Sequence, residues 1–168
     1  DIYDSSIPNI IINGNIHAHN LNYFNKKNHF LGPEYLILKK EYRNYKETAT
    51  INNTEKSIMI TTGGADFNRV MIKFVKSLKN LNLTKYIIIG PSYEEDYIKE
   101  IKKETDKSFK IIFKPKSLRE YIEKSDFVIT AAGSTVYEIL TLKRVPIIYT
   151  LADNQKMIAN ELEKYGIL

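Results

Sequence analysis

Gly133, Ser134 and Thr135 stand together where a short apolar run gives way to a helical pattern. The run at residues 127–130 (Phe-Val-Ile-Thr) consists of strand formers, and apolar residues recur at helical spacing after Thr135. A strand, a turn of small residues and a helix N-terminus direct free backbone N–H groups and the positive end of the helix dipole toward one point. The stretch from Ala132 to Thr135 therefore predicts an anion site, best suited to a phosphate.

Glu138 follows about one helical turn after this turn of small residues. A carboxylate there can accept two hydrogen bonds from a vicinal diol, as acidic residues do with a ribose. The alternative is a charge that stabilises the helix N-terminus by about 0.3–1 kcal/mol. Beside a predicted anion site we favour the first interpretation, so the expected ligand is a nucleotide.

The elements that would position these residues follow in a regular order after residue 56. Strands are predicted at residues 58–62, 86–89, 109–113, 127–130 and 145–149. Helices are predicted at residues 70–81 and 93–103, after Ser117, from Ser134, and at residues 154–165. Ser117 and Glu120 form a predicted capping box. Asp153 is predicted to cap the last helix, and Gly166 to end it. Nearly continuous apolar strands that alternate with helices are typical of a parallel sheet covered on both faces. We therefore predict a doubly wound, Rossmann-like α/β domain over residues 57–168. Residues 1–56 are predicted to be an irregular segment with one short strand near residues 9–13.

Gly63 and Gly64 follow the first strand of this domain directly. In the common doubly wound order 3-2-1-4-5 the first and fourth strands are neighbours, and ligands bind at their carboxyl ends. The Gly63-Gly64 turn and the Gly133 turn are therefore expected to meet at one crevice. Neither turn has the pattern of a dinucleotide-binding or a nucleoside-triphosphatase loop, so no such cofactor is expected.

Composition narrows the class of protein further. The net charge of +5 comes from basic residues scattered through the predicted helices, which favours solvated faces over a nucleic-acid surface. No apolar run approaches the roughly 20 residues of a membrane helix, and no leader peptide is visible. The chain has no cysteine, which excludes disulfides and cysteine metal sites and fits a cytoplasmic protein. No acidic cluster faces the predicted phosphate site, so no metal is expected.

Together these motifs resemble the carboxyl-terminal domain of a UDP-sugar hydrolase family. The most similar members are the pseudaminic-acid pathway hydrolases of UDP-2,4-diacetamido-2,4,6-trideoxy-β-L-altropyranose and their spore-coat polysaccharide relatives. The stretches that carry the resemblance are residues 9–15, 31–38, 63–66, 132–138 and Pro146 followed by 153–155. The front segment departs from the family at Ile12-Asn13-Gly14-Asn15 and at residues 39–42, which leaves the exact sugar open.

The resemblance implies a role for each matching residue. Gly133, Ser134 and Thr135 would hold the diphosphate of UDP, and Glu138 the ribose hydroxyls. The backbone at Phe113 and Lys114 would contact uracil. Gly63 and Gly64 would let the ligand approach the backbone closely. Asp66, Asn154 and Gln155 would contact the sugar.

In this family a preceding amino-terminal domain carries the catalytic histidine, so no catalytic residue is expected in these 168 residues. His17, His19 and His29 fall in the interdomain segment and are predicted to be solvated. Two alternatives stay open, because the same UDP cradle serves a glycosyltransferase donor domain and could serve a non-catalytic UDP-binding module.

Overall fold

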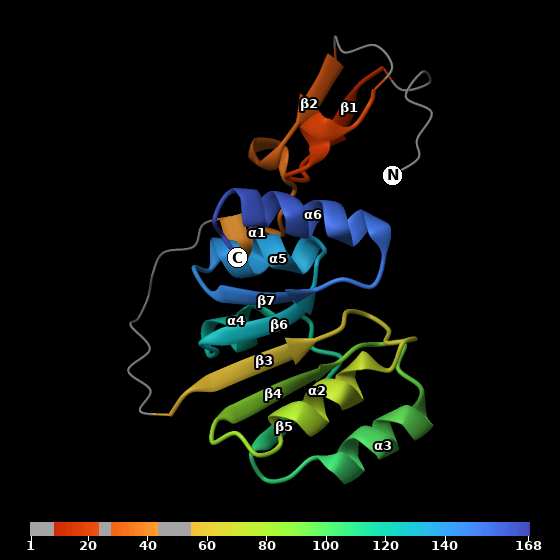
Figure 1. Cartoon of the computed structure of the whole chain (residues 1–168), viewed down its shortest axis with the longest axis vertical. Coiled ribbons are helices and arrows are strands. Elements are labelled where there is room, and N and C mark those ends of the chain that lie inside the picture. The colour runs from red at the N-terminus through yellow and green to blue at the C-terminus, as the bar shows by residue number, and fades with distance from the viewer. Residues whose placement is uncertain (1–8, 24–27, 44–54) are drawn as a thin grey trace. The chain divides into compact units, whose positions relative to one another are not determined.

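A computed structural model describes residues 9–23, 28–43 and 55–168 of the chain (Figure 1). It divides into two compact units, one formed by Asp1–Lys40 with Thr150–Leu168 and the other by Glu41–Tyr149. We call them unit 1 and unit 2 and describe each by itself. Most of the predicted connection at residues 48–55 lies outside the described residues. The predicted domain division at residue 56 stays a prediction.

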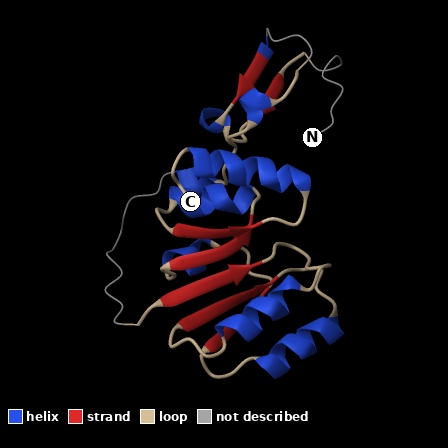
Figure 2. Ribbon diagram, viewed as in Figure 1, coloured by secondary structure: helices blue, strands red, loops and turns tan. Residues whose placement is uncertain are grey.

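Unit 2 is built on a five-stranded parallel sheet in the order β5-β4-β3-β6-β7 (Figure 2). The strands are β3 (Ser57–Thr61), β4 (Thr84–Ile89), β5 (Phe109–Phe113), β6 (Phe127–Ala131) and β7 (Val145–Tyr149). This is the predicted 3-2-1-4-5 order. Successive strands are added toward one edge of the sheet up to β5 and toward the other edge from β6 onward, so the switch point lies between β3 and β6. All five residues of the central strand β3 are buried, which explains why its sequence is a nearly continuous apolar run. The predicted doubly wound fold is confirmed.

Four helices of this unit join the strands: α2 (Val70–Leu78), α3 (Glu95–Glu104), α4 (Arg119–Glu123) and α5 (Ser134–Thr141). Helices α2 and α3 lie on one face of the sheet and α4 on the other (Figure 1). A buried cluster joins α2 and α3 to the facing strands and includes Ile58, Ile60, Met71, Val75, Ile87, Ile89, Tyr97 and Ile101. The helical spacing of apolar residues was therefore a correct guide to the core-facing side of both helices.

The boundaries of several helices differ from the prediction. Helix α2 ends at Leu78, and Leu81 is exposed; α3 starts two residues late, so that Tyr93 lies in the preceding loop. The predicted capping box at Ser117 is wrong, because α4 begins at Arg119 after Leu118, although the Ser117 hydroxyl still accepts from the Arg119 N–H at 3.1 Å. Such one- or two-residue shifts arise because the last turn of a helix depends on packing as much as on local sequence.

Unit 1 contains a pair of short parallel strands, β1 (Ile11–Asn13) and β2 (His29–Leu31), and helix α6 (Asp153–Lys164). Strand β2 was not predicted. A short 3-10 helix, Ala18–Asn20, interrupts the predicted loop over residues 14–28, and its Asn20 amide donates to Glu161 of α6 at 2.9 Å. Asp153 is the first residue of α6 and does not cap it, whereas Gly166 ends the helix with a φ of +65° as predicted.

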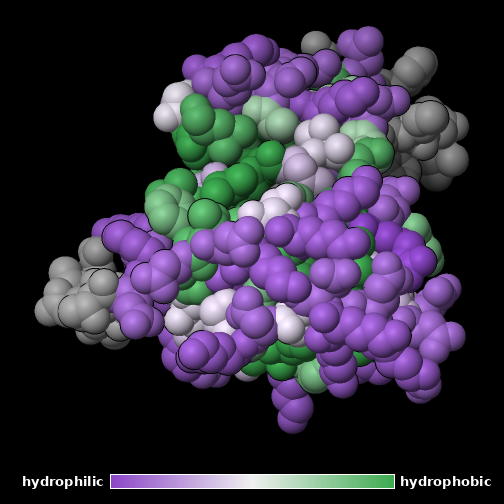
Figure 3. Space-filling model, turned by 60° about the horizontal axis from the view of Figure 1, so that its bottom comes forward, coloured by the Kyte–Doolittle hydropathy of each residue, from purple (hydrophilic) through white to green (hydrophobic). Residues whose placement is uncertain are grey.

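Polar side chains cover most of the face shown in Figure 3, with smaller apolar areas between them. Many of the lysines on α2 and α3 are exposed, including Lys73, Lys76, Lys99, Lys102 and Lys103. In the described part of the chain, no helix combines the length and the apolar character needed to cross a membrane.

Candidate functional site

The carboxyl ends of β3 and β6 meet at the reversal point of the sheet. The two strands are paired so that Thr61 lies opposite Thr130. Gly63 therefore follows β3 at the same edge of the sheet at which Gly133 follows β6. The structure brings together the two glycine turns that the sequence placed at one crevice.

The turn after β3 depends on glycine at two different places. Gly63 has a φ of +91°, a conformation that side chains rarely adopt, and a Cβ built on it would meet nothing within 4 Å. Gly90, at the end of β4, is needed for close packing, because its Cβ would lie 2.4 Å from the carbonyl oxygens of both Gly63 and Gly64. The Ser92 N–H donates to the Gly64 carbonyl at 2.9 Å and fixes this approach. This packing role of Gly90 was not predicted from the sequence.

Asp66 lies at the end of the same turn and points into the protein. Its carboxylate accepts from the backbone N–H groups of Val70 and Met71 at 2.9 and 2.8 Å and from the Tyr97 hydroxyl at 2.8 Å. The residue is 9% exposed. A carboxylate at a helix N-terminus satisfies N–H groups that have no partner inside the helix. Asp66 thus anchors the turn to α2 and α3, while its predicted contact with a sugar stays a prediction.

Three tyrosines, Tyr93, Tyr97 and Tyr149, surround the turn that follows β3. Tyr93 and Tyr97 stack with ring centroids 5.7 Å apart, and the Tyr93 hydroxyl is hydrogen-bonded to Thr62. Tyr149, at the end of β7, packs against Phe74 with ring centroids 5.2 Å apart. Burial raises the pKa of all three tyrosines, and the nearby Asp66 carboxylate raises it further. They stay neutral at physiological pH, and the hydroxyls of Tyr93 and Tyr97 form hydrogen bonds, whereas Tyr149 contributes packing.

The turn after β6 is the one at which the sequence predicts an anion site. The Gly133 N–H donates to the Ala131 carbonyl at 2.8 Å, and the Ala132 N–H donates to the Tyr149 carbonyl at 3.0 Å. Within the described residues, by contrast, the N–H groups of Ser134 and Thr135 have no acceptor. They open helix α5 and point, with its dipole, toward the carboxyl edge of the sheet.

Gly133 itself has an unusual combination of features. Its φ of −140° and ψ of −160° are extended backbone that any residue adopts, so the conformation does not require glycine. A Cβ built on it would meet nothing within 4 Å, so packing does not require glycine either. The space in front of α5 is open, and a small residue leaves it open for a ligand to approach the backbone.

Glu138 lies one turn into α5 and is half-buried. Its charge acts on Tyr42, a fully buried residue of the short helix α1 (Lys40–Arg43). Burial raises the pKa of Tyr42 to about 12, and the negative charge of Glu138 contributes to the increase. Tyr42 was not predicted to be near Glu138, because it lies in a segment that shows no regular pattern and its only signal is that it is aromatic.

Phe113 and Lys114 lie at the end of β5, an edge strand separated from β3 by β4. Phe113 is 47% exposed, and the Lys102 ammonium lies 5.0 Å from the centre of its ring. Lys114 has a φ of +43°, and its N–H donates to the Ile89 carbonyl at 2.9 Å. The backbone thus turns sharply at the end of β5, where the family resemblance implies contacts with a base.

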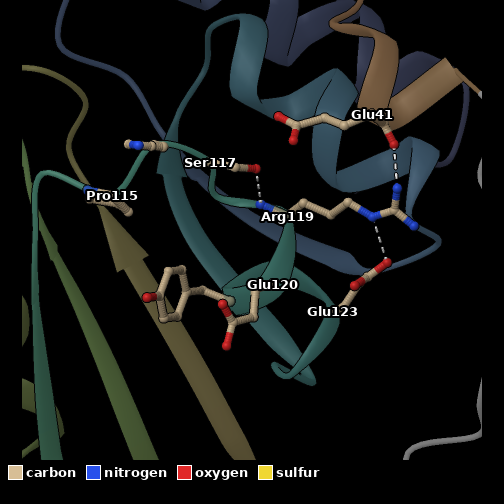
Figure 4. A pocket seen from close by; sticks show the side chains of 8 residues that line it. Glu41, Pro115, Ser117, Arg119, Glu120 and Glu123 are labelled. Carbon is tan, nitrogen blue, oxygen red and sulfur yellow. Dashed lines mark hydrogen bonds and ion pairs between the residues drawn. The ribbon is translucent and has the colours of Figure 1, made fainter.

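The residues after Lys114 line a cavity of about 430 Å³ (Figure 4). Arg119 spans it: its guanidinium pairs with Glu123 at 2.9 Å and donates to the Glu41 carbonyl. The other lining residues are Pro115, Lys116, Ser117, Glu120 and Tyr121. Sequence reasoning did not find this cavity, since Glu41 comes from a segment more than 70 residues away.

Asn154 and Gln155 belong to unit 1, and their predicted contact with a sugar stays a prediction. Asn154 is exposed, whereas the Gln155 side-chain oxygen accepts from the Leu151 N–H at 2.7 Å, just before α6. Gln155 therefore closes the turn that leads into its own helix.

The three histidines, all in unit 1, differ from one another. His19 is exposed, as predicted, and His29 is half-buried. The prediction that His17 is solvated is wrong, because it is only 4% exposed and burial lowers its pKa. It lies beside the short 3-10 helix, which the sequence did not reveal. No group of three or more histidine, aspartate or glutamate side chains in the described residues could hold a metal ion.

Comparison with known proteins agrees with this architecture. No protein-family model matches the chain. The uncharacterized protein MJ1062 of Methanocaldococcus jannaschii is 30% identical over 151 residues, covering 83% of this chain and 31% of that protein. The spore coat polysaccharide biosynthesis protein SpsG of Bacillus subtilis is 21% identical over 141 residues, covering 80% of this chain and 41% of that protein.

Among solved structures, the crystal structure of GtfA/B complex shares the fold with a TM-score of 0.50 at 17% identity, covering 85% of this chain and 34% of that chain. The chain thus spans less than half the length of the proteins that it matches. Its fold is Rossmann-like, with distant homology to a polysaccharide biosynthesis protein.

Proposed function

We propose that this chain is the nucleotide-binding part of a UDP-sugar hydrolase in surface-polysaccharide or nonulosonic acid biosynthesis. The observation that carries the proposal is the open N-terminus of α5, where Gly133 is required neither by backbone conformation nor by packing. The adjoining N–H groups of Ser134 and Thr135 are available, and the turn lies at the point of the sheet where doubly wound proteins bind ligands. The distant similarity to SpsG supports a role in polysaccharide synthesis.

In this proposal the diphosphate of UDP binds the N–H groups of Ser134 and Thr135. The helix dipole and these donors stabilise the negative charge on UDP as it leaves, when water attacks the bond between sugar and nucleotide. Glu138 accepts hydrogen bonds from the ribose hydroxyls. Phe113 and Lys114 supply the wall for uracil. The Gly63-Gly64 turn lets the ligand approach the backbone at the other side of the crevice.

The base that activates water belongs, in this proposal, to an amino-terminal domain of the same protein, as the family resemblance implies. The substrate is then a UDP-linked amino sugar, the products are UDP and the free sugar, and the site of action is the cytoplasm. No nucleic acid takes part.

A glycosyltransferase donor domain is the second candidate, favoured by the fold shared with the crystal structure of GtfA/B complex. A transferase would use the same UDP cradle and would pass the sugar to an acceptor instead of water. Full-length protein that releases UDP and free sugar without an acceptor would support the hydrolase. If UDP is released only when an acceptor is present, the hydrolase hypothesis is wrong and the glycosyltransferase hypothesis is supported.

Calorimetric titration of the chain with UDP tests the nucleotide site itself. We expect binding by the unmodified chain and binding weaker by about 100-fold or more by Glu138→Ala, which removes two hydrogen bonds to a charged acceptor. Glu120→Ala is the matched control, because Glu120 is exposed and pairs only with Lys124, so its affinity should be unchanged. If Glu138→Ala binds UDP as well as the unmodified chain does, the ribose assignment is wrong. Binding without turnover in the full-length protein would favour a non-catalytic UDP-binding module.

A further inference from the structure

Unit 1 contains a separate cavity of about 350 Å³ beside strand β2. Its polar lining consists of His19, Tyr23, His29, Glu34 and Tyr35, and two leucines complete the walls. The volume is at the lower end of the range of about 300–1,000 Å³ that small-molecule sites occupy. None of the residues in this cavity has a role in the proposed nucleotide site.

Two of the polar groups converge over Gly32. A Cβ built on Gly32 would lie 2.6 Å from Glu34 Oε2 and 2.8 Å from His19 Nε2, so a side chain at this position would displace both. Gly32 also has a φ of +107°, which favours glycine on its own. The backbone thus keeps an imidazole nitrogen and a carboxylate oxygen close to the same point.

His29 adds a polar atom that lacks a partner. Its Nδ1 is buried and has no hydrogen-bond partner in the described part of the chain. The ring lies 5.1 Å from the ring of Tyr23, whose hydroxyl accepts from the Asn13 amide at 2.8 Å, so both rings are held in place. The His29 ring is therefore a fixed part of the cavity wall.

We propose that this cavity is a binding site for a neutral carbohydrate of monosaccharide size. Among the described residues that line it there is no lysine or arginine, and the Glu34 carboxylate disfavours an anionic ligand. A neutral imidazole both donates and accepts hydrogen bonds, and a carboxylate accepts from hydroxyl groups, which matches the mixed donors and acceptors of a sugar. The rings of Tyr23 and Tyr35 offer apolar surface for its C–H groups. This proposal does not depend on the nucleotide site.

Nuclear magnetic resonance of the histidine rings tests the proposal on the whole chain, which has three histidines. We expect N-acetyl-D-glucosamine, added at constant pH, to shift the ring signals of His19 and His29 in a saturable way. The signal of His17, which does not line the cavity, is the internal control. Inorganic phosphate should leave all three unshifted.

Substitutions in exposed positions complete the test. His19→Gln and Glu34→Gln should each weaken sugar binding about 10-fold, because each removes hydrogen bonds without disturbing a buried side chain. Asn22→Ala, at an exposed neighbour outside the cavity, should leave it unchanged. Absence of any saturable shift with the sugar, or a shift with phosphate alone, would overturn the proposal. UDP affinity, measured separately, should be the same in all three variants, so the outcome is independent of the proposed nucleotide site.

Discussion

The substitution Gly133→Ala places a single methyl group in the open space before helix α5. The unmodified residue has extended backbone, and its added Cβ meets nothing within 4 Å. The protein alone therefore accommodates the methyl group without strain. A phosphate held by the N–H groups of Ser134 and Thr135 would compete with it for the same space.

The expected effect on stability is small, because two contributions oppose each other. Alanine reduces the conformational freedom of the unfolded chain, which stabilises the protein by about 0.4–1 kcal/mol. Alanine is also a poorer residue than glycine before a helix, which costs on the order of 0.5 kcal/mol. The free energy of unfolding should therefore change by less than about 0.5 kcal/mol.

The expected effect on UDP binding is much larger. A hydrogen bond to a charged group contributes about 1.5–3 kcal/mol, and the methyl group should prevent at least one such bond. The affinity for UDP should fall about 10- to 100-fold. Uridine, which has no phosphate, should bind equally well to both proteins.

Urea denaturation and calorimetric titration with UDP measure the two quantities on the same samples. Ser134→Ala is the comparison variant, since it removes an exposed hydroxyl from the same turn but keeps the backbone N–H groups, and it should lose only a few-fold in affinity. Unchanged UDP affinity in Gly133→Ala would refute the reasoning that the glycine keeps space for a phosphate. A loss of stability above 1 kcal/mol would show instead that the space before α5 is not open.

Three further predictions follow from the supports of the site. Gly90→Ala would push a Cβ to 2.4 Å from two carbonyl oxygens of the neighbouring turn and should lower the unfolding free energy by about 1–3 kcal/mol in urea denaturation; an unchanged midpoint would contradict the close approach. Asp66→Ala leaves three donors without their acceptor and should cost about 2–4 kcal/mol in the same assay, whereas a cost below 0.5 kcal/mol would mean that the carboxylate is not structural. Because the folded pKa of Tyr42 is raised to about 12, its contribution to stability is complete below pH 10 and is lost as the pH rises through about 12. The difference in phenolate absorbance between the unmodified chain and Tyr42→Phe measures that pKa, which Glu138→Gln should lower; no change in this variant would remove Glu138 as a cause.

The part of the site that the sequence predicted rests on local signals. Gly63 and Gly133 each follow an apolar strand, and the strand order of doubly wound sheets places them at the same edge. Local pattern also identified the start of α5 at Ser134, because small residues before a helical repeat mark a helix N-terminus.

The parts that the sequence did not predict depend on residues far apart along the chain. A sugar-side contact was predicted for Asp66, whereas its hydrogen bond from the Tyr97 hydroxyl, 31 residues away, was not predicted. The approach of Gly90 to the first glycine turn requires two strands to be paired, and neither stretch shows it alone. His17 is buried by neighbours that no periodic pattern reveals.

Sequence by itself therefore determined the layout of this protein: five parallel strands in a definite order and two glycine turns at the point where that order reverses. It could do so because hydrophobic periodicity and turn chemistry act over a few residues. Only the tertiary structure decided which polar groups support the fold and where open space is left beside a turn. That distinction depends on the partners that each group finds across the fold, such as Tyr42 beside Glu138, and on the open space left in front of Gly133.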